Sequence, residues 1–197
     1  MSEDLSKSRR VVALGLGAAV AGSLIPTAAR AADSDRDTYS EPEIVRAAED
    51  FFGAAAEGLA NVIHHIFNEK GRPNGYITGD EGSGAIGVGL RYGGGRLHLK
   101  GLSSVTPVYW QGPSIGFDTG GNASKVFTLV YHMHDPERIF QRFPGVDGSA
   151  YFVGGFGANY QQSGRIILAP IRAGVGFRLG ANIGYLNYSR HRRVLPF

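Results

Sequence analysis

The sequence of 197 residues contains no cysteine. No disulfide can stabilise the fold, so its stability must come from packing alone. A single tryptophan stands beside 11 phenylalanines, 9 tyrosines and 30 glycines. A composition rich in these aromatic residues and in glycine is typical of a β protein.

The apolar stretch near the N-terminus is short. Residues 11–25, VVALGLGAAVAGSLI, fall below the roughly 20 residues that a transmembrane helix needs. They follow the pair Arg9-Arg10 and precede Ala29-Arg30-Ala31, a cleavage pattern of small residues. We predict that residues 1–31 are a cleaved, twin-arginine-like export signal and that residues 32–197 form one periplasmic domain. The alternative is an uncleaved membrane anchor.

Neither sign of charge dominates the chain. The predicted signal holds 4 of the 20 basic and 2 of the 17 acidic residues, which leaves 16 basic and 15 acidic residues in the mature chain. A net charge of +1 is not the electrostatic footprint of a nucleic-acid-binding protein. We therefore expect no nucleic-acid partner.

Glycine alternates with bulky residues in two stretches, residues 174–185 (GVGFRLGANIGY) and 85–92 (AIGVGLRY). This period of two predicts β-strands with one face in an apolar core. Each interior glycine costs about 0.5–1 kcal/mol relative to alanine. The glycines therefore indicate sharp bending, or close approach of another backbone or a ligand. We predict a small soluble antiparallel β-barrel or barrel-like closed sheet.

Short β patterns separated by turn signals fill the chain from residue 74 onward. The turn signals are residues 93–95 (GGG), 112–113 (GP), 118–122 and 162–164. Dense, evenly spaced strands favour an antiparallel sandwich or barrel. The predicted strands cover residues 75–78, 85–92, 96–99, 105–110, 114–118, 125–132, 150–159, 165–169, 173–179 and 181–188.

One long helix is predicted before the sheet. Ser40 and Glu43 have the spacing of a capping box, and apolar residues recur at helical spacing as far as Phe67. We expect a single helix over residues 40–70, packed on a glycine-bearing face or open end of the sheet. A second, short helix is predicted at residues 137–141, because Asp135-Pro136 resembles a helix start.

No motif meets the requirements of a catalytic, cofactor or metal site. Residues 82–87 match G-x-G-x-x-G, but a strand pattern follows where a dinucleotide site needs a helix. Asp80 and Glu81 are adjacent on a strand, so they point to opposite faces and cannot act on one bond. The run His132-x-His134-Asp135 offers three metal ligands at most, and we expect a solvated strand end. We predict no enzyme activity, no cofactor and no metal.

Four residues are the candidates for ligand binding: Tyr109, Trp110, Phe117 and Asp118. In one interpretation Trp110 is a core aromatic whose indole N–H finds a partner such as Asp118. In the other, the four residues border an apolar pocket that admits an acyl chain or a peptide. A single tryptophan favours the core interpretation, and both stay open.

Residues 109–118, YWQGPSIGFD, and 121–127, GNASKVF, resemble the envelope integrity protein EipA family of Gram-negative bacteria. The resemblance extends over nearly the whole mature chain. Its other matching segments are residues 76–77, 80–86, 142–146, 159–161, 169–176, 180–186 and 196–197.

The resemblance implies a small soluble β-barrel in the periplasm that keeps the cell envelope intact. The family has no assigned active site, so no catalytic residues carry over. We expect a monomer that acts without catalysis, by binding or scaffolding of lipid, peptidoglycan or outer-membrane proteins. A looser likeness to the SYLF lipid-binding domain implies the alternative, carriage of a lipid or another hydrophobic ligand.

Overall fold

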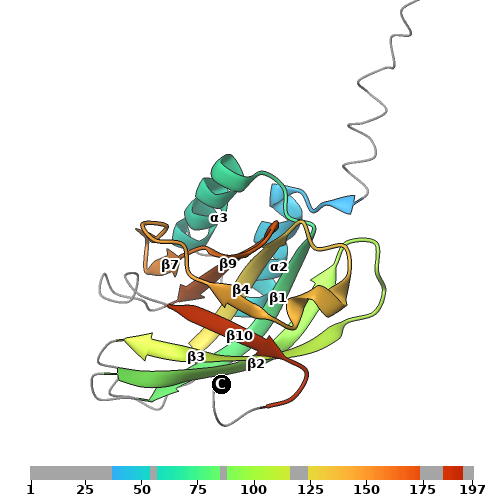
Figure 1. Ribbon diagram of the computed structural model, residues 1–197. Helices are drawn as coiled ribbons and strands as arrows, with labels where there is room; N and C mark the ends of the chain where they lie inside the picture. The colour runs from blue at the N-terminus through green and yellow to red at the C-terminus, as the bar shows by residue number, and fades with distance from the viewer. Residues whose placement is uncertain (1–36, 54–56, 85–87, 116–123, 174–183, 193–197) are drawn as a thin grey trace, which may run out of the picture.

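Figure 1 shows a computed structural model of the chain, which describes residues 37–53, 57–84, 88–115, 124–173 and 184–192. The predicted export signal lies outside these ranges, as does nearly all of the glycine-rich stretch 174–185.

Within the described segments, ten strands form one antiparallel sheet in the order β5-β10-β3-β2-β1-β4-β9-β7-β6, with β8 also paired to β9. The longest strands, β1 to β3, adjoin one another in this order. The bounds are β1 (Gly75–Gly84), β2 (Val88–Leu99), β3 (Thr106–Ile115), β4 (Ser124–Tyr131), β5 (Arg142–Pro144), β6 (Tyr151–Val153), β7 (Phe156–Ala158), β8 (Gln161–Ser163), β9 (Ile166–Ala173) and β10 (Tyr185–Ser189).

The sheet curls until strands from its two ends meet (Figure 1). A single antiparallel bridge between Gly145 and Gln161 joins the residue after β5 to β8. Beside this bridge the Ser163 hydroxyl donates to Gln141 Oε1 at 3.0 Å. The mainly antiparallel β prediction is confirmed, and the fold is barrel-like. Complete closure is not confirmed, since one bridge rather than a ladder joins these strands among the described residues.

Both faces of β4 and β9 are largely buried, because residues of these strands alternate between two apolar cores. On β4, Phe127 and Leu129 face the helices, whereas Val126 and Val130 face the interior of the curled sheet. The interior is filled mainly by large side chains. Among them are Ile77, Leu97, Val108, Trp110, Phe143, Ile166, Leu168, Leu186 and Tyr188.

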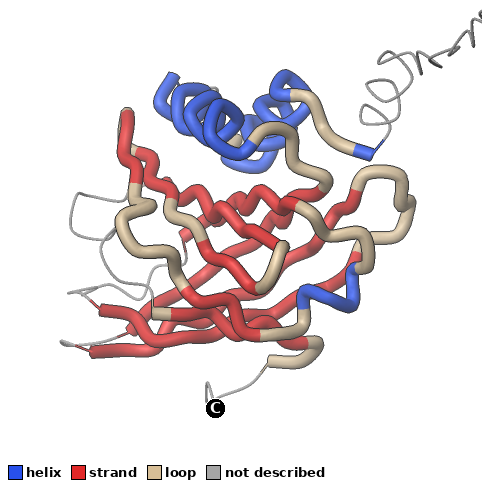
Figure 2. Tube along the Cα trace, turned by 45° about the horizontal axis from the view of Figure 1, so that its top comes forward, coloured by secondary structure: helices blue, strands red, loops and turns tan. Residues whose placement is uncertain are grey.

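Two helices, α2 (Glu41–Phe52) and α3 (Glu57–Lys70), cover the outer face of the sheet (Figure 2). The prediction of one long helix is wrong. Gly53 adopts φ 79°, in the left-handed region, and its N–H donates to the Glu49 carbonyl at 2.8 Å, which ends α2. The capping box is present, because Glu43 Oε2 accepts from the Ser40 N–H at 2.7 Å. No described helix is long and apolar enough to cross a membrane.

Two predicted turns lie inside strands. Residues 93–95 are in the middle of β2, and Gly112-Pro113 are within β3. The glycines serve close packing rather than chain reversal. A Cβ on Gly93 would overlap the Trp110 indole, and one on Gly112 would overlap the Tyr185 carbonyl. Close approach, one of the two reasons for interior glycine, therefore applies at both positions.

A short helix is predicted at residues 137–141. The structure has a 3₁₀ helix there, η1 (Pro136–Ile139), which begins one residue before the predicted start. Asp135 caps it as expected, because its Oδ1 accepts from the Glu137 N–H at 2.9 Å. The predicted strand over residues 150–159 is instead the hairpin β6–β7. Its turn residues Gly154 and Gly155 both have positive φ, 56° and 81°.

Candidate functional site

A cluster of charged side chains is buried inside the curled sheet. Glu81 on β1, Arg91 on β2 and Arg172 on β9 are 6%, 5% and 6% exposed. Strand alternation points each of them inward, on the same face as Ile77, Leu97 and Leu168, respectively. The cluster lies toward one end of the sheet, where β1 ends at Gly84 and β9 ends at Ala173.

The Glu81 carboxylate is the centre of this cluster. Arg172 approaches it with two nitrogens, Nε at 2.5 Å from Oε1 and Nη2 at 3.3 Å from Oε2. Arg91 Nη1 lies 3.4 Å from Oε1, and the Trp110 indole N–H donates to Oε2 at 3.2 Å. Arg172 Nη1 also donates to Asn159 Oδ1 at 3.0 Å. One carboxylate thus connects β2, β1, β3 and β9.

The two arginines keep Glu81 ionised. Burial alone would raise the pKa of this carboxyl, but the charges of Arg172 and Arg91 and the hydrogen bonds lower it more, so the pKa lies below its ordinary value. Burial also raises the pKa of the nearby Tyr188 hydroxyl, so that phenol is neutral at pH 7. Among the described residues, the cluster therefore contains two positive charges and one negative charge.

Within the cluster, no second carboxyl group faces the same site as Glu81 among the described residues. An ionised Glu81 cannot give a proton to a leaving group, and the neighbouring carboxylate of Asp80 is exposed on the outer face. What the cluster can do is fix the curvature of the sheet and offer guanidinium groups to an anion.

Glycine makes room for the Trp110 ring beside the cluster. Gly93 on β2 pairs with Trp110 on β3, and its bare backbone lies against the indole. The ring of Tyr188 packs 5.8 Å away, centre to centre. The glycine-rich face of β2 is thus the inner face, where it accommodates a large aromatic ring.

The structure describes two of the four predicted ligand residues. Trp110 is 3% exposed in the interior, and its N–H donates to Glu81. Tyr109 is half-buried on the opposite face of β3, where its ring lies beside Gly94. Phe117 and Asp118 lie outside the described residues. A ligand-binding role for the four stays a prediction.

Sequence reasoning missed Glu81, Arg91 and Arg172. The sequence pattern suggests Glu81 only as a catalytic partner of Asp80. The strand alternation could have revealed the cluster. Each charged residue lies an even number of positions from a buried aliphatic residue on its strand, so the two share one face. A charged residue on such a face needs a partner inside the protein.

Neither His132 nor His134 belongs to a metal site in the part of the chain described. Both are exposed, and β4 ends before them at Tyr131. His132 has φ 59°, which turns the chain away from the strand. No group of three His, Asp or Glu residues able to hold a metal ion occurs in the described segments.

A partly open cavity of about 250 Å³ lies at the opposite end of the sheet, near the start of β1 and the end of β2. Its wall is mixed in character. Asn74 in this wall is fixed by two hydrogen bonds to the backbone of Met133, at 2.6 and 3.2 Å. The lining residues are Asp37, Asn74, Leu99, Lys100, Gly101, Leu102, Met133 and His134.

The sequence profile of envelope integrity protein A matches residues 37–197, which include all described strands, α2, α3 and the charged cluster. The chain belongs to the envelope integrity protein A family. A beta-barrel-like, uncharacterized protein from Brucella abortus, known from its crystal structure, is similar to this member of the family. The two are 46% identical with a TM-score of 0.75, over 82% of this chain and 99% of that chain. No curated protein matches the chain.

Proposed function

We propose that this member of the envelope integrity protein A family is a monomeric periplasmic protein that maintains the envelope without catalysis, by binding or scaffolding envelope components. Family membership supports the envelope role, and the predicted signal at residues 1–31 supports export. The proposal further holds that the curled sheet is closed as a barrel through the contact of Gly145 with Gln161.

The packed interior of the sheet is the observation that carries this proposal. Trp110, Phe143 and Tyr188 fill it together with aliphatic residues from several strands. A carrier needs a continuous apolar cavity, whereas a scaffold needs a packed interior and an available surface. The buried charges of Glu81 and Arg172 also oppose an acyl chain, because an apolar ligand would not satisfy them.

Lipid carriage of the SYLF type is the alternative. In that case Tyr109, Trp110, Phe117 and Asp118 would contact the lipid, and Trp110 would have to leave its hydrogen bond with Glu81. Trp110 and Tyr109 would therefore have different roles in a lipid carrier and in a scaffold. In a scaffold, Trp110 supports the fold and Tyr109 stays available on the outer face.

Native mass spectrometry of the full-length protein expressed for export and purified from the periplasm tests both ideas. The scaffold proposal expects the mass of the polypeptide alone, and the same spectrum checks cleavage after Ala31. A lipid retained in the native spectrum and lost under denaturing conditions would establish carriage instead. The envelope role is checked separately, by the growth of a deletion strain in detergent with and without the restored gene.

A further inference from the structure

Exposed arginines gather around η1 and β5. Three segments meet at Gln141. Its Nε2 donates to the Arg138 carbonyl at 2.6 Å, its Oε1 accepts from Ser163 at 3.0 Å, and its carbonyl accepts from the Tyr188 N–H at 3.0 Å. Each of these segments carries exposed arginine. We define the arginine patch as Arg138, Arg142, Arg165, Arg190 and Arg192.

Aromatic rings hold two of these guanidinium groups in place. The Arg142 guanidinium lies 4.3 Å from the ring centre of Tyr185, and that of Arg190 lies 4.5 Å from the ring centre of Phe140. Stacking of this kind leaves the nitrogen edge of Arg142 available to an anion, whereas Glu137 pairs with Arg190. The patch thus presents charges that are partly ordered before any partner arrives.

Acidic residues in these segments neutralise only part of the patch. Glu137 pairs with Arg190, and Asp135 caps η1. The helices on the other side of the sheet have the opposite balance, with six acidic and two basic residues in α2 and α3. Figure 2 shows these helices on one side of the sheet and η1 toward the other. Lys100 pairs with Glu43 and Lys125 donates to the Phe51 carbonyl, so cations from outside the helices offset part of this acidic excess.

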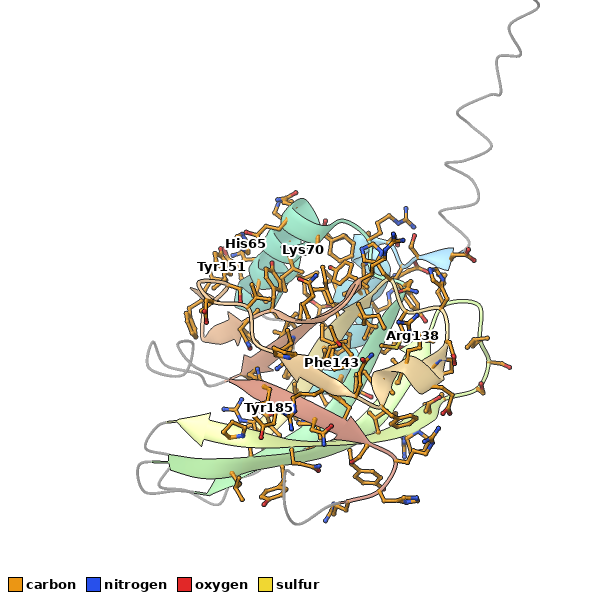
Figure 3. All side chains as sticks on the ribbon, in the orientation of Figure 1. His65, Lys70, Arg138, Phe143, Tyr151 and Tyr185 are labelled. Carbon is orange, nitrogen blue, oxygen red and sulfur yellow. The ribbon has the colours of Figure 1, made fainter. Side chains whose placement is uncertain are left out.

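Two exposed apolar side chains accompany the arginines. Leu102 and Val105, 48% and 43% exposed, lie on the connection between β2 and β3. Figures 1 and 2 both show this connection beside η1, and Figure 3 labels Arg138 there. Leu102 also lines the same cavity as His134, two residues before η1. Apolar and cationic side chains thus share one region of the surface.

We propose that the arginine patch, with Leu102 and Val105, docks the protein on a bilayer that contains anionic phospholipids. Guanidinium groups match lipid phosphates in charge and geometry. Exposed aliphatic side chains among them can enter the boundary between headgroups and acyl chains. The inference rests on the proposed function and deepens it, because it names the component that the scaffold binds.

Sedimentation with vesicles tests the proposal. The mature protein is mixed with vesicles of phosphatidylcholine and phosphatidylglycerol, or of phosphatidylcholine alone, at low and high salt. We expect binding only to the anionic vesicles and weakening by salt, which screens surface charges. Replacement of Arg138, Arg142 and Arg165 by Gln should weaken partitioning by about fivefold for each arginine. Leu102→Ser should weaken it without changing the salt dependence.

Arg46→Gln is the matched control, because Arg46 is an exposed arginine on α2, on the acidic side of the molecule. It should leave vesicle binding unchanged. The single variant Arg165→Gln, in an exposed turn, keeps the test valid even where the triple variant fails to fold.

Absence of binding to anionic vesicles, equal binding to both kinds, or a preference for a single-stranded nucleic acid would overturn the proposal. So would equal losses in Arg165→Gln and Arg46→Gln. Such results would not alter the native mass spectrum or the detergent growth assay, so failure of docking and failure of the scaffold function are separable.

Discussion

Glu81 and Arg172 are 91 residues apart in sequence, yet their side chains meet with Oε1 and Nε at 2.5 Å. Their strands, β1 and β9, are not neighbours, because β4 lies between them. The ion pair therefore spans the inner face of the curled sheet. It fixes the curvature that brings the two ends of the sheet together.

Glu81→Gln should destabilise the protein strongly. The substitution keeps the size of the side chain but removes the buried negative charge that Arg172 and Arg91 face. Breaking a buried ion pair by removing one partner costs about 3–5 kcal/mol. Unfolding in urea at pH 7 measures this cost.

Asp80→Asn is the control for this experiment. It removes the same charge one residue away, on the exposed outer face of β1, and should change the stability by less than about 0.5 kcal/mol. Equal effects of the two substitutions would mean that the cluster does not hold the sheet together.

Low pH should remove the stabilisation that the Glu81 charge gives the native protein. The pKa of Glu81 is lower in the folded protein than its ordinary value of 4.5. Its contribution to stability is therefore complete above pH 4.5 and is lost as the pH falls through the folded pKa. The difference in stability between the native protein and Glu81→Gln should shrink in that window.

Urea unfolding of both proteins at a series of acidic pH values measures this difference. Glu43, whose pKa is lowered to about 2 chiefly by its hydrogen bond with Lys100, titrates in both proteins and cancels. A difference that stays constant as the pH falls would contradict the assignment of an ionised Glu81.

The alternation of residue types predicted the strands because the side-chain period of a strand is a local property. The interior position of Trp110 agrees with the core interpretation, which the sequence favours because the chain has a single tryptophan. The break at Gly53 was missed, since the apolar spacing continues across it and only the left-handed conformation of that glycine ends α2. Local turn rules also failed at residues 93–95, where packing against Trp110 requires glycine within a strand.

The charged cluster could not be predicted from one sequence. Its partners come from β1, β2 and β9, and nothing in the spacing of Glu81, Arg91 and Arg172 says that these strands share an interior. The curl of the sheet, a long-range property, brings them together. The capping box at Ser40, in contrast, depends only on residues three apart and was predicted correctly.

Gly93→Ala should displace Trp110. The added methyl would overlap the indole ring, and overpacking of this kind costs about 1–3 kcal/mol. Because the chain has one tryptophan, its fluorescence reports the displacement directly. We expect a shifted emission maximum together with a lower urea midpoint.

Gly82→Ala is the matched control on β1, where an added Cβ would meet no described atom within 4 Å. It should leave the emission unchanged and the stability equal or slightly higher, since alanine restricts the unfolded chain more than glycine does. Unchanged fluorescence in Gly93→Ala would show that the bare backbone is not what accommodates the indole.

Gly58→Ala separates helix propensity from packing. In an isolated helix, alanine is about 1 kcal/mol better than glycine. Here a Cβ on Gly58 would lie 2.5 Å from the carbonyl oxygen of Gly154, so α3 would have to move away from the β6–β7 hairpin. Because backbone cannot yield as a flexible side chain does, the clash of about 1–3 kcal/mol should outweigh the gain in propensity.

We expect Gly58→Ala to lower the free energy of unfolding and to speed amide exchange in α3. Asn61→Ala, on the exposed face of the same helix, is the control and should stabilise the protein slightly. A stabilised Gly58→Ala variant would mean that α3 does not dock on the hairpin through this glycine contact.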